Sequence, residues 1–297
     1  MNEVISIQQR LNAYRCASSK EEDQALREIL QEFILAALGR TDYFTKAAFH
    51  GGTHLRIFHG LRRFSEDLDF ALREDDPGFS LSPYLDKAKK ELEAIGVHVE
   101  TIDKSRVDST VKKAFLKSDS IVTLVNLRFR ANIGSLQTPR KLRVKIEVDS
   151  HPPAGARYES RPLAFPFPAS ITNFDLPSSF AGKMHALLCR EYVKGRDWYD
   201  FIWYVGSGVP LNHNLLTAAL DQQGKWAGQH VVTSDGWVKG ELKKVIAELD
   251  WAKARADVEP FIHEDERKTL DSFSADFFTS LVDRLMAVPT VDGAEGE

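Results

Sequence analysis

The sequence predicts an α+β fold, in which a mixed β-sheet core is followed by an all-helical C-terminal half. Two patterns predict it. Between residues 41 and 150, short apolar runs that alternate with period two are separated by turn residues and by one helix-length segment. From about residue 176 onward, apolar residues instead recur at three- and four-residue spacing, which is typical of amphipathic helices.

The first expected element is an amphipathic helix over residues 20–39, with Gly39 as a suitable C-terminal stop. The next are a strand over 43–49, a turn at Gly51-Gly52, a helix over 53–59 and a strand within 63–72. Ser82 should cap a helix that runs to about residue 95.

Later elements follow the same reasoning. We expect strands over 97–102, 121–130 and 141–149, a proline-rich crossing over 162–168, and helices near 177–194, 197–205, 212–221, 234–255 and 264–287. The expected domains are an N-terminal helical segment (1–40), a core (41–150), a helical C-terminal domain (151–290) and a disordered tail (291–297).

The composition excludes several classes of protein. A chain of 297 residues with 43% hydrophobic and 28% charged residues can bury a sizeable core. No apolar run approaches a membrane span, and the N-terminus lacks the basic and apolar regions of a signal peptide. Cys16 and Cys189 are far apart and lack metal-ligand spacing, so neither a disulfide nor a zinc framework is expected. We therefore expect a cytoplasmic protein with no membrane partner.

Charge is distributed unevenly along the chain. Residues 104–145 hold eleven basic residues against two acidic ones, a net charge of +9, which leaves −13 for the remainder of a chain of net charge −4. Such segregation is the expected footprint of a phosphate-rich partner, with Lys112, Lys113 and Lys117 as candidate nucleic-acid ligands. Solvated lysines on exposed strand edges are an equally good explanation.

Most of the candidate metal and phosphate ligands lie between residues 48 and 70. Asp67 and Asp69 alternate with Leu68 and Phe70, so a strand would place both carboxylates on one face. Two such carboxylates repel each other unless a cation lies between them, and hard oxygen ligands suit Mg²⁺. The preceding glycine pair would let backbone N–H groups approach an anion at a helix start. Together these features favour nucleotide chemistry; an ordinary turn and a solvated edge strand are the alternative.

Two strings in this segment carry a family resemblance. Gly51-Gly52-Thr53-x-Leu55-Arg56 and Gly60-Leu61-x-Arg63-Phe64-Ser65-Glu66-Asp67-Leu68-Asp69-Phe70 resemble the signature of the AbiEii/AbiGii-type toxin nucleotidyltransferases, within the DNA polymerase beta-like superfamily. The resemblance implies a polymerase-beta-like nucleotidyltransferase core with two Mg²⁺ at Asp67 and Asp69. The nucleotide ligands that it implies are Gly51, Gly52, Thr53, Arg56 and Ser65.

The resemblance also requires a third carboxylate from a neighbouring strand. In residues 144–149 the apolar residues share one face, and Lys145, Glu147 and Asp149 share the other. We prefer Glu147 as the metal ligand, because it lies mid-strand while Asp149 lies beside the break at Pro152-Pro153. Alternatively, Glu147 only pairs with Lys145 or with an arginine of an adjacent strand.

A second string, from Lys183 to Phe201, resembles the later signature of the same family. By resemblance Lys183 contacts the triphosphate, and Asp197 orients Lys183 or the nucleotide. Asp197 would equally suit the N-cap of a helix. Arg190 and Lys194 are candidates for attracting nucleic acid. The histidines beside the glycine pair, His50 and His54, are more simply explained as partly buried helix-surface residues.

The resemblance implies an enzyme that is the toxin of a toxin–antitoxin or phage-defence system. It would use NTP and Mg²⁺ to add nucleotide to the 3′ end of tRNA and so block translation, and an antitoxin encoded nearby would be its partner. A small-molecule nucleotidyltransferase of the antibiotic-modifying type, a nucleotide-binding module without catalysis and a phosphoryl-transferring toxin are the alternatives.

Overall fold

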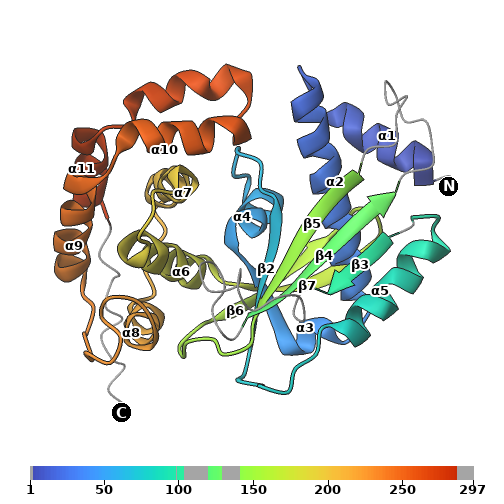
Figure 1. Cartoon of the computed structure of the whole chain (residues 1–297), viewed down its shortest axis with the longest axis horizontal. Helices are drawn as coiled ribbons and strands as arrows, with labels where there is room; N and C mark the ends of the chain where they lie inside the picture. Colours follow the sequence, from blue (N-terminus) through green and yellow to red (C-terminus); the bar gives the residue numbers. More distant parts are fainter. Residues whose placement is uncertain (1–2, 98, 104–119, 129–140, 286–297) are drawn as a thin grey trace, which may run out of the picture. The chain divides into compact units, whose positions relative to one another are not determined.

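The computed structural model describes residues 3–97, 99–103, 120–128 and 141–285 (Figure 1). The chain divides into two compact units, and each is described by itself. Unit 1 comprises Met1–Pro152, Tyr158–Phe174 and Phe261–Glu264, and unit 2 comprises Pro153–Arg157, Asp175–Pro260 and Asp265–Glu297.

Unit 1 is built on a seven-stranded mixed sheet of order β3-β4-β5-β2-β1-β7-β6. Its strands are β1 (Ala47–His50), β2 (Asp67–Leu72), β3 (Val99–Asp103), β4 (Ser120–Arg128), β5 (Lys141–Asp149), β6 (Tyr158–Leu163) and β7 (Ala169–Phe174). The pairs β2–β5 and β1–β7 are parallel and the other neighbours are antiparallel. The mixed sheet confirms the α+β expectation.

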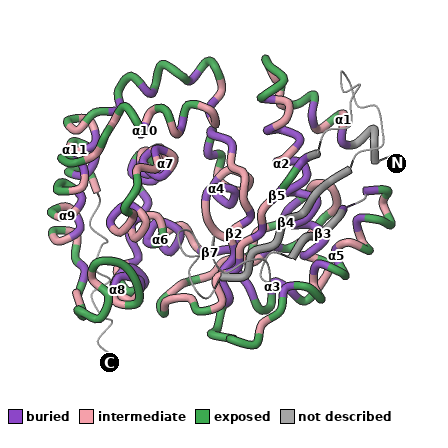
Figure 2. The backbone as a smooth tube through the Cα atoms, in the orientation of Figure 1, coloured by how far each residue is buried: buried purple, intermediate pink, exposed green. Residues whose placement is uncertain are grey.

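The helices of unit 1 are α1 (Glu3–Ala13), α2 (Ser19–Gly39), α3 (Tyr43–Lys46), α4 (Gly51–His59) and α5 (Ser82–Ala94). The helix α2 begins where Ser18 accepts a hydrogen bond from the Glu21 N–H, as an N-cap does. It is buried along most of its length (Figure 2) and packs on α5, β5 and β7. The predicted helix over 20–39 is therefore confirmed, and its buried residues pack against the sheet.

Unit 2 is helical, as predicted for this half of the chain. It contains α6 (Leu176–Cys189), α7 (Gly195–Gly206), α8 (His213–Gln222), α9 (Asp235–Glu248), α10 (Trp251–Val258), most of the short 3₁₀ segments Glu259–Phe261 and Glu264–Ser272, and α11 (Ala275–Asp283). Its core is aromatic: Trp251 stacks on Phe278 with ring centroids 4.4 Å apart, and Trp198 meets both rings edge-on. Two helices expected over 234–255 and 264–287 are each interrupted, because Asp250 and Ser274 cap new helix starts.

Residues 43–49 do not form the single strand that we expected. Tyr43–Lys46 is a helical turn, and the strand is limited to Ala47–His50. The reason is tertiary: the Tyr43 ring is fully buried and meets Phe44, Phe70 and Tyr84 edge-on, and this packing overrides the local strand preference. A smaller difference is that Ser82 is the first residue of α5 and Leu81 occupies the cap.

The proline-rich segment 162–168, expected as a crossing, instead joins two strands. The sheet continues past residue 150, because β6 and β7 add to the edge of β1. Pro162 is tolerated in β6 because β6 is an edge strand, where a missing N–H costs no ladder hydrogen bond. The residues of β6 do not alternate regularly between polar and apolar, so the sequence did not predict this strand.

Some predictions fall outside the described residues. These are the candidate nucleic-acid ligands Lys112, Lys113 and Lys117 and the expected tail 291–297. Within the part of the chain that the structure describes, no helix is both long and apolar enough to cross a bilayer.

Candidate active site

The predicted metal carboxylates lie on two adjacent strands. Because β2 runs parallel to β5, Asp69 is the register partner of Glu147, and Asp67 is the partner of Lys145. Register partners point to the same side of a sheet, so three carboxylates and one ammonium form a compact group. Leu68 is fully buried while Asp67 and Asp69 are half-buried, which confirms the alternation read from the sequence.

Lys145 supplies the positive charge in this group. Its ammonium is ion-paired with the Glu147 carboxylate. Burial alone would lower the pKa of Lys145, but the hydrogen bond to Glu147 and the charges of Glu147, Asp67 and Asp69 raise it above its usual value. The carboxylates therefore share one electrostatic environment, which favours a cation among them. Asp149 lies at the strand end, where its Oδ1 accepts the His151 N–H at 3.1 Å.

The glycine turn lies directly against this carboxylate group. Gly51 begins α4 with φ = +84°, a conformation that favours glycine. A Cβ at Gly51 would overlap the Asp69 Oδ2. Close packing of the helix start on Asp69 thus requires glycine, and it places the positive end of the α4 dipole beside the carboxylates.

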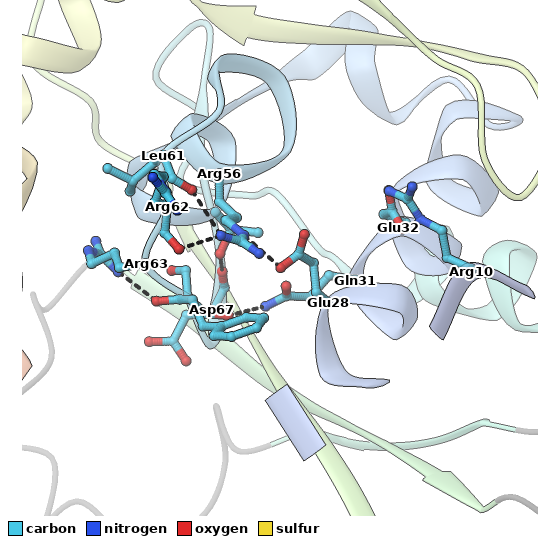
Figure 3. Close-up of polar contacts among 12 residues, drawn as sticks. Arg10, Glu28, Gln31, Glu32, Arg56, Leu61, Arg62, Arg63 and Asp67 are labelled. Atoms are coloured by element: carbon cyan, nitrogen blue, oxygen red, sulfur yellow. Dashed lines mark hydrogen bonds and ion pairs between the residues drawn. The ribbon is translucent and has the colours of Figure 1, made fainter. Parts of the chain in front are cut away.

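Gly52 makes a second close approach that the sequence did not lead us to expect. A Cβ there would lie 2.6 Å from Arg63 Nη2 and 2.9 Å from Ser65 Oγ. Arg63 is only 3% exposed and donates to the Phe64 carbonyl at 2.9 Å (Figure 3). The Arg63 guanidinium and the Ser65 hydroxyl therefore lie against the start of α4. Arg63 is part of the signature string, but its burial against Gly52 is not encoded by any local pattern.

Thr53 and Arg56, two of the expected nucleotide ligands, hold the scaffold together. The Thr53 hydroxyl donates to the Asp67 carbonyl at 2.5 Å, which ties α4 to β2. Arg56 Nε pairs with Glu28 of α2 at 2.9 Å, and Arg56 Nη1 donates to the carbonyls of Leu61 and Arg62 (Figure 3). Any contact of these two residues with nucleotide stays a prediction.

The later signature forms its own cluster in unit 2. Lys183 Nζ lies 2.7 Å from Asp197 Oδ1 and 2.8 Å from Asp200 Oδ2, and Arg190 Nε lies 3.1 Å from Asp197 Oδ2. Both aspartates are buried. Burial alone would raise the pKa of Asp197, but Lys183, Lys194 and Arg190 hold it well below its usual value.

The alternative explanation of Asp197 as a helix cap is wrong. The helix α7 begins at Gly195 with Lys194 as its N-cap, and Asp197 lies inside the first turn. Gly195 is required there, because any Cβ would overlap the Ala254 carbonyl. The Asp197 side chain instead forms an ion pair with Lys183, and the orienting role that the resemblance implied stays a prediction. Arg190 contacts Asp197, and burial lowers the pKa of Lys194, so both cations belong to this cluster. Their contact with nucleic acid stays a prediction.

A histidine pair lies on α4, at its fourth residue and at its last. His54 is fully buried, and its Nε2 is 3.2 Å from the Nε2 of His59. Glu159 of β6 approaches His59 Nε2 to 3.9 Å and accepts from Arg161 Nε at 2.6 Å. Burial is the main cause that lowers the pKa of His59 to about 4, and it places the pKa of His54 well below its usual value.

These lowered pKa values predict acid sensitivity of unit 1. An unfolded histidine binds a proton near pH 6.5, whereas folded His59 binds one only near pH 4, so its contribution to stability is complete above pH 6.5 and declines as pH falls. Between pH 6.5 and pH 5 the loss from His59 should be about 2 kcal/mol. Urea unfolding of His59→Gln, with chelator present, should show a shallower decline than the wild type. His151, which is exposed and pairs with Asp75 at 2.9 Å, provides the control for loss of a histidine, and His151→Gln should decline more steeply with falling pH than His59→Gln. Equal slopes for all three proteins would contradict this assignment.

Comparison with known proteins adds family information to this geometry. The family model described as "Nucleotidyl transferase AbiEii toxin, Type IV TA system" matches residues 34–283. Among curated proteins, none matches the chain. The MenT4 nucleotidyltransferase toxin of Mycobacterium tuberculosis H37Rv has a similar structure over 96% of this chain and 99% of its own, with 14% identity and a TM-score of 0.48. JHP933 from Helicobacter pylori is similar over 88% of this chain and 91% of its own, with 16% identity and a TM-score of 0.47.

Proposed function

The chain belongs to the AbiEii family of nucleotidyltransferase toxins of type IV toxin–antitoxin systems, and on that premise we propose that it transfers nucleotide from an NTP to the 3′ end of tRNA in a Mg²⁺-dependent reaction. The observation that carries the proposal is the register of Asp69 with Glu147 directly beside the Gly51 turn. It supplies a place for metal and a place for phosphate side by side.

The residues present fit a divalent cation. Three carboxylates from adjacent strands already gather around the Lys145 ammonium, so the group accommodates positive charge. Hard carboxylate oxygens with remaining room for water suit Mg²⁺. Asp67, Asp69 and Glu147 would hold the metal, which, when bound, supplies a lowered pKa for the attacking hydroxyl and neutralises charge on the leaving pyrophosphate.

The phosphate side of the site is supplied by α4 and its surroundings. The N–H groups at Gly51 and Gly52 open the helix, where its dipole favours an anion. Arg63 and Ser65 lie against Gly52 and add a charge-assisted donor and a hydroxyl to that end of the helix. The N-terminus of α4 with Arg63 and Ser65 is the proposed phosphate site. Thr53 ties this helix to β2 through the Asp67 carbonyl, which would hold the phosphate site and the carboxylates in one geometry.

The antitoxin partner follows from the family, and the tRNA acceptor is part of our proposal. A toxin of a type IV system has an antitoxin partner. The tRNA acceptor rests on the resemblance and on the +9 charge of residues 104–145, and it places the reaction in the cytoplasm. Because phosphate contacts release counterions, tRNA modification should fall steeply with salt, whereas modification of an uncharged small molecule should not.

The test is transfer of label to total tRNA from each of the four NTPs, labelled in parallel at the α- and the γ-phosphate. We expect α-label on tRNA from at least one NTP, none in excess EDTA, and recovery on adding Mg²⁺ beyond the chelator, because the carboxylates need their cation. Label only from the γ-phosphate would show phosphoryl transfer instead. Absence of label on tRNA with every NTP, from protein that is folded and toxic in cells, would overturn the tRNA assignment.

A further inference from the structure

His54, His59 and Glu159 form a group that the proposed nucleotidyl transfer does not use. One ligand atom from each residue lies within 4.8 Å of the others. All three belong to unit 1, with the histidines on α4 and Glu159 on the edge strand β6. Two imidazoles and a carboxylate are ligands that zinc-type transition metals prefer, in contrast to the all-oxygen group at Asp67 and Asp69.

The spacing of the donor atoms fits one tetrahedral ion. With Zn–N bonds of about 2.0–2.1 Å, two ligands of a tetrahedral site lie about 3.3 Å apart. The two Nε2 atoms are 3.2 Å apart, and Glu159 Oε1 is 3.9 Å from His59 Nε2. The Glu159 carboxylate has to move closer, and its side chain is 33% exposed against 6% for His59.

The surroundings also suit a ligand set. The two Nε2 atoms lie within hydrogen-bond distance of each other, so a metal bound to both would replace that contact and require the proton of each ring on Nδ1. Burial keeps both rings neutral at pH 7, as coordination requires. Arg161 Nε donates to Glu159 Oε1 at 2.6 Å, and this is the same oxygen that lies 3.9 Å from His59 Nε2. The Arg161 charge opposes a cation, so metal binding requires the Glu159 carboxylate to turn, keeping Arg161 on one oxygen and offering the other to the metal.

We propose that His54, His59 and Glu159 form a binding site for a zinc-type divalent transition metal, distinct from the carboxylate group of β2 and β5. Three protein ligands leave the fourth position to water. The metal would join α4 to β6 and so fix the helix whose N-terminus, at Gly51 and Gly52, is the proposed phosphate site.

The test is Zn²⁺ titration of untagged full-length protein against a chromophoric chelator, in millimolar Mg²⁺ to occupy the oxygen ligands of Asp67 and Asp69. We expect one Zn²⁺ per chain and a melting temperature about 5 °C higher at 100-fold Zn²⁺ over Kd. Co²⁺ should give the intense visible bands of a four-coordinate site. Glu159→Gln should weaken binding at least about tenfold, and His59→Gln should abolish the visible bands.

Two control variants test whether Zn²⁺ binds at other residues instead. Asp69→Asn should leave Zn²⁺ affinity unchanged, which excludes the carboxylate group as its source. His151→Gln removes an exposed histidine and should also leave it unchanged. If His59→Gln fails to fold, the one-third exposed Glu159→Gln decides. Absence of stoichiometric Zn²⁺ binding, or binding that Glu159→Gln and His59→Gln do not alter, would overturn the proposal, whatever the result with tRNA.

Discussion

The Asp69→Asn protein should fold and melt at or above the wild-type temperature, yet lose nucleotide transfer by about a thousandfold or more. Asp69 lies opposite Glu147 and two residues from Asp67, so removing its charge relieves repulsion in the metal-free protein. The same change removes a central metal ligand, and the metal contributes several kcal/mol of transition-state stabilisation, about 4 kcal/mol for a thousandfold loss. Initial rates of label transfer and thermal melting measure the two effects separately.

Matched controls lie next to these residues in the sequence. Glu66→Gln removes a neighbouring carboxylate that pairs with Arg27 at 3.1 Å, and it should retain most of the activity. Glu147→Gln should lose activity as Asp69→Asn does, whereas Asp149→Asn should keep it, because Asp149 lies opposite Ala71 at the strand end. Wild-type turnover by folded Asp69→Asn, or loss at Asp149 with retention at Glu147, would contradict this choice of ligands.

The parts of this site that the sequence predicts are those fixed by local geometry. The period of two in a strand places Asp67 and Asp69 together, and the same period in residues 141–149 places Glu147 with Lys145. The sequence also predicts the turn at Gly51, because the positive φ at this helix start favours glycine.

What the sequence could not predict depends on contacts between distant segments. Burial of Arg63 over Gly52 is set by the path of the chain between α4 and β2, and no periodicity encodes it. The strands β6 and β7 carry weak patterns because one of them is a sheet edge. Aspartate is a residue type that often caps helices, and only the structure shows that Asp197 lies inside the first turn of α7 and pairs with Lys183, fourteen residues earlier.

Lys183→Met should destabilise the protein by about 3–5 kcal/mol, because it leaves Asp197 and Asp200 buried without their shared ammonium. Loss of activity in this variant would therefore not by itself place Lys183 in the catalytic site. Adding Asp200→Asn removes one of the two buried carboxylates that have lost the Lys183 ammonium. The double variant should therefore regain much of the lost stability, as measured by urea unfolding. Asp200→Asn alone keeps the pair of Lys183 with Asp197, and it is the matched control.

Activity of the double variant then separates the two roles of Lys183. If its ammonium meets the triphosphate, the restabilised double variant should remain inactive while Asp200→Asn alone stays active, with the deficit in kcat rather than in KM alone, because charge on the leaving pyrophosphate develops in the transition state. If Lys183 only neutralises buried carboxylates, stability and activity should return together. An active, restabilised double variant would remove Lys183 from the chemistry and leave Asp197 as a residue of the unit 2 core.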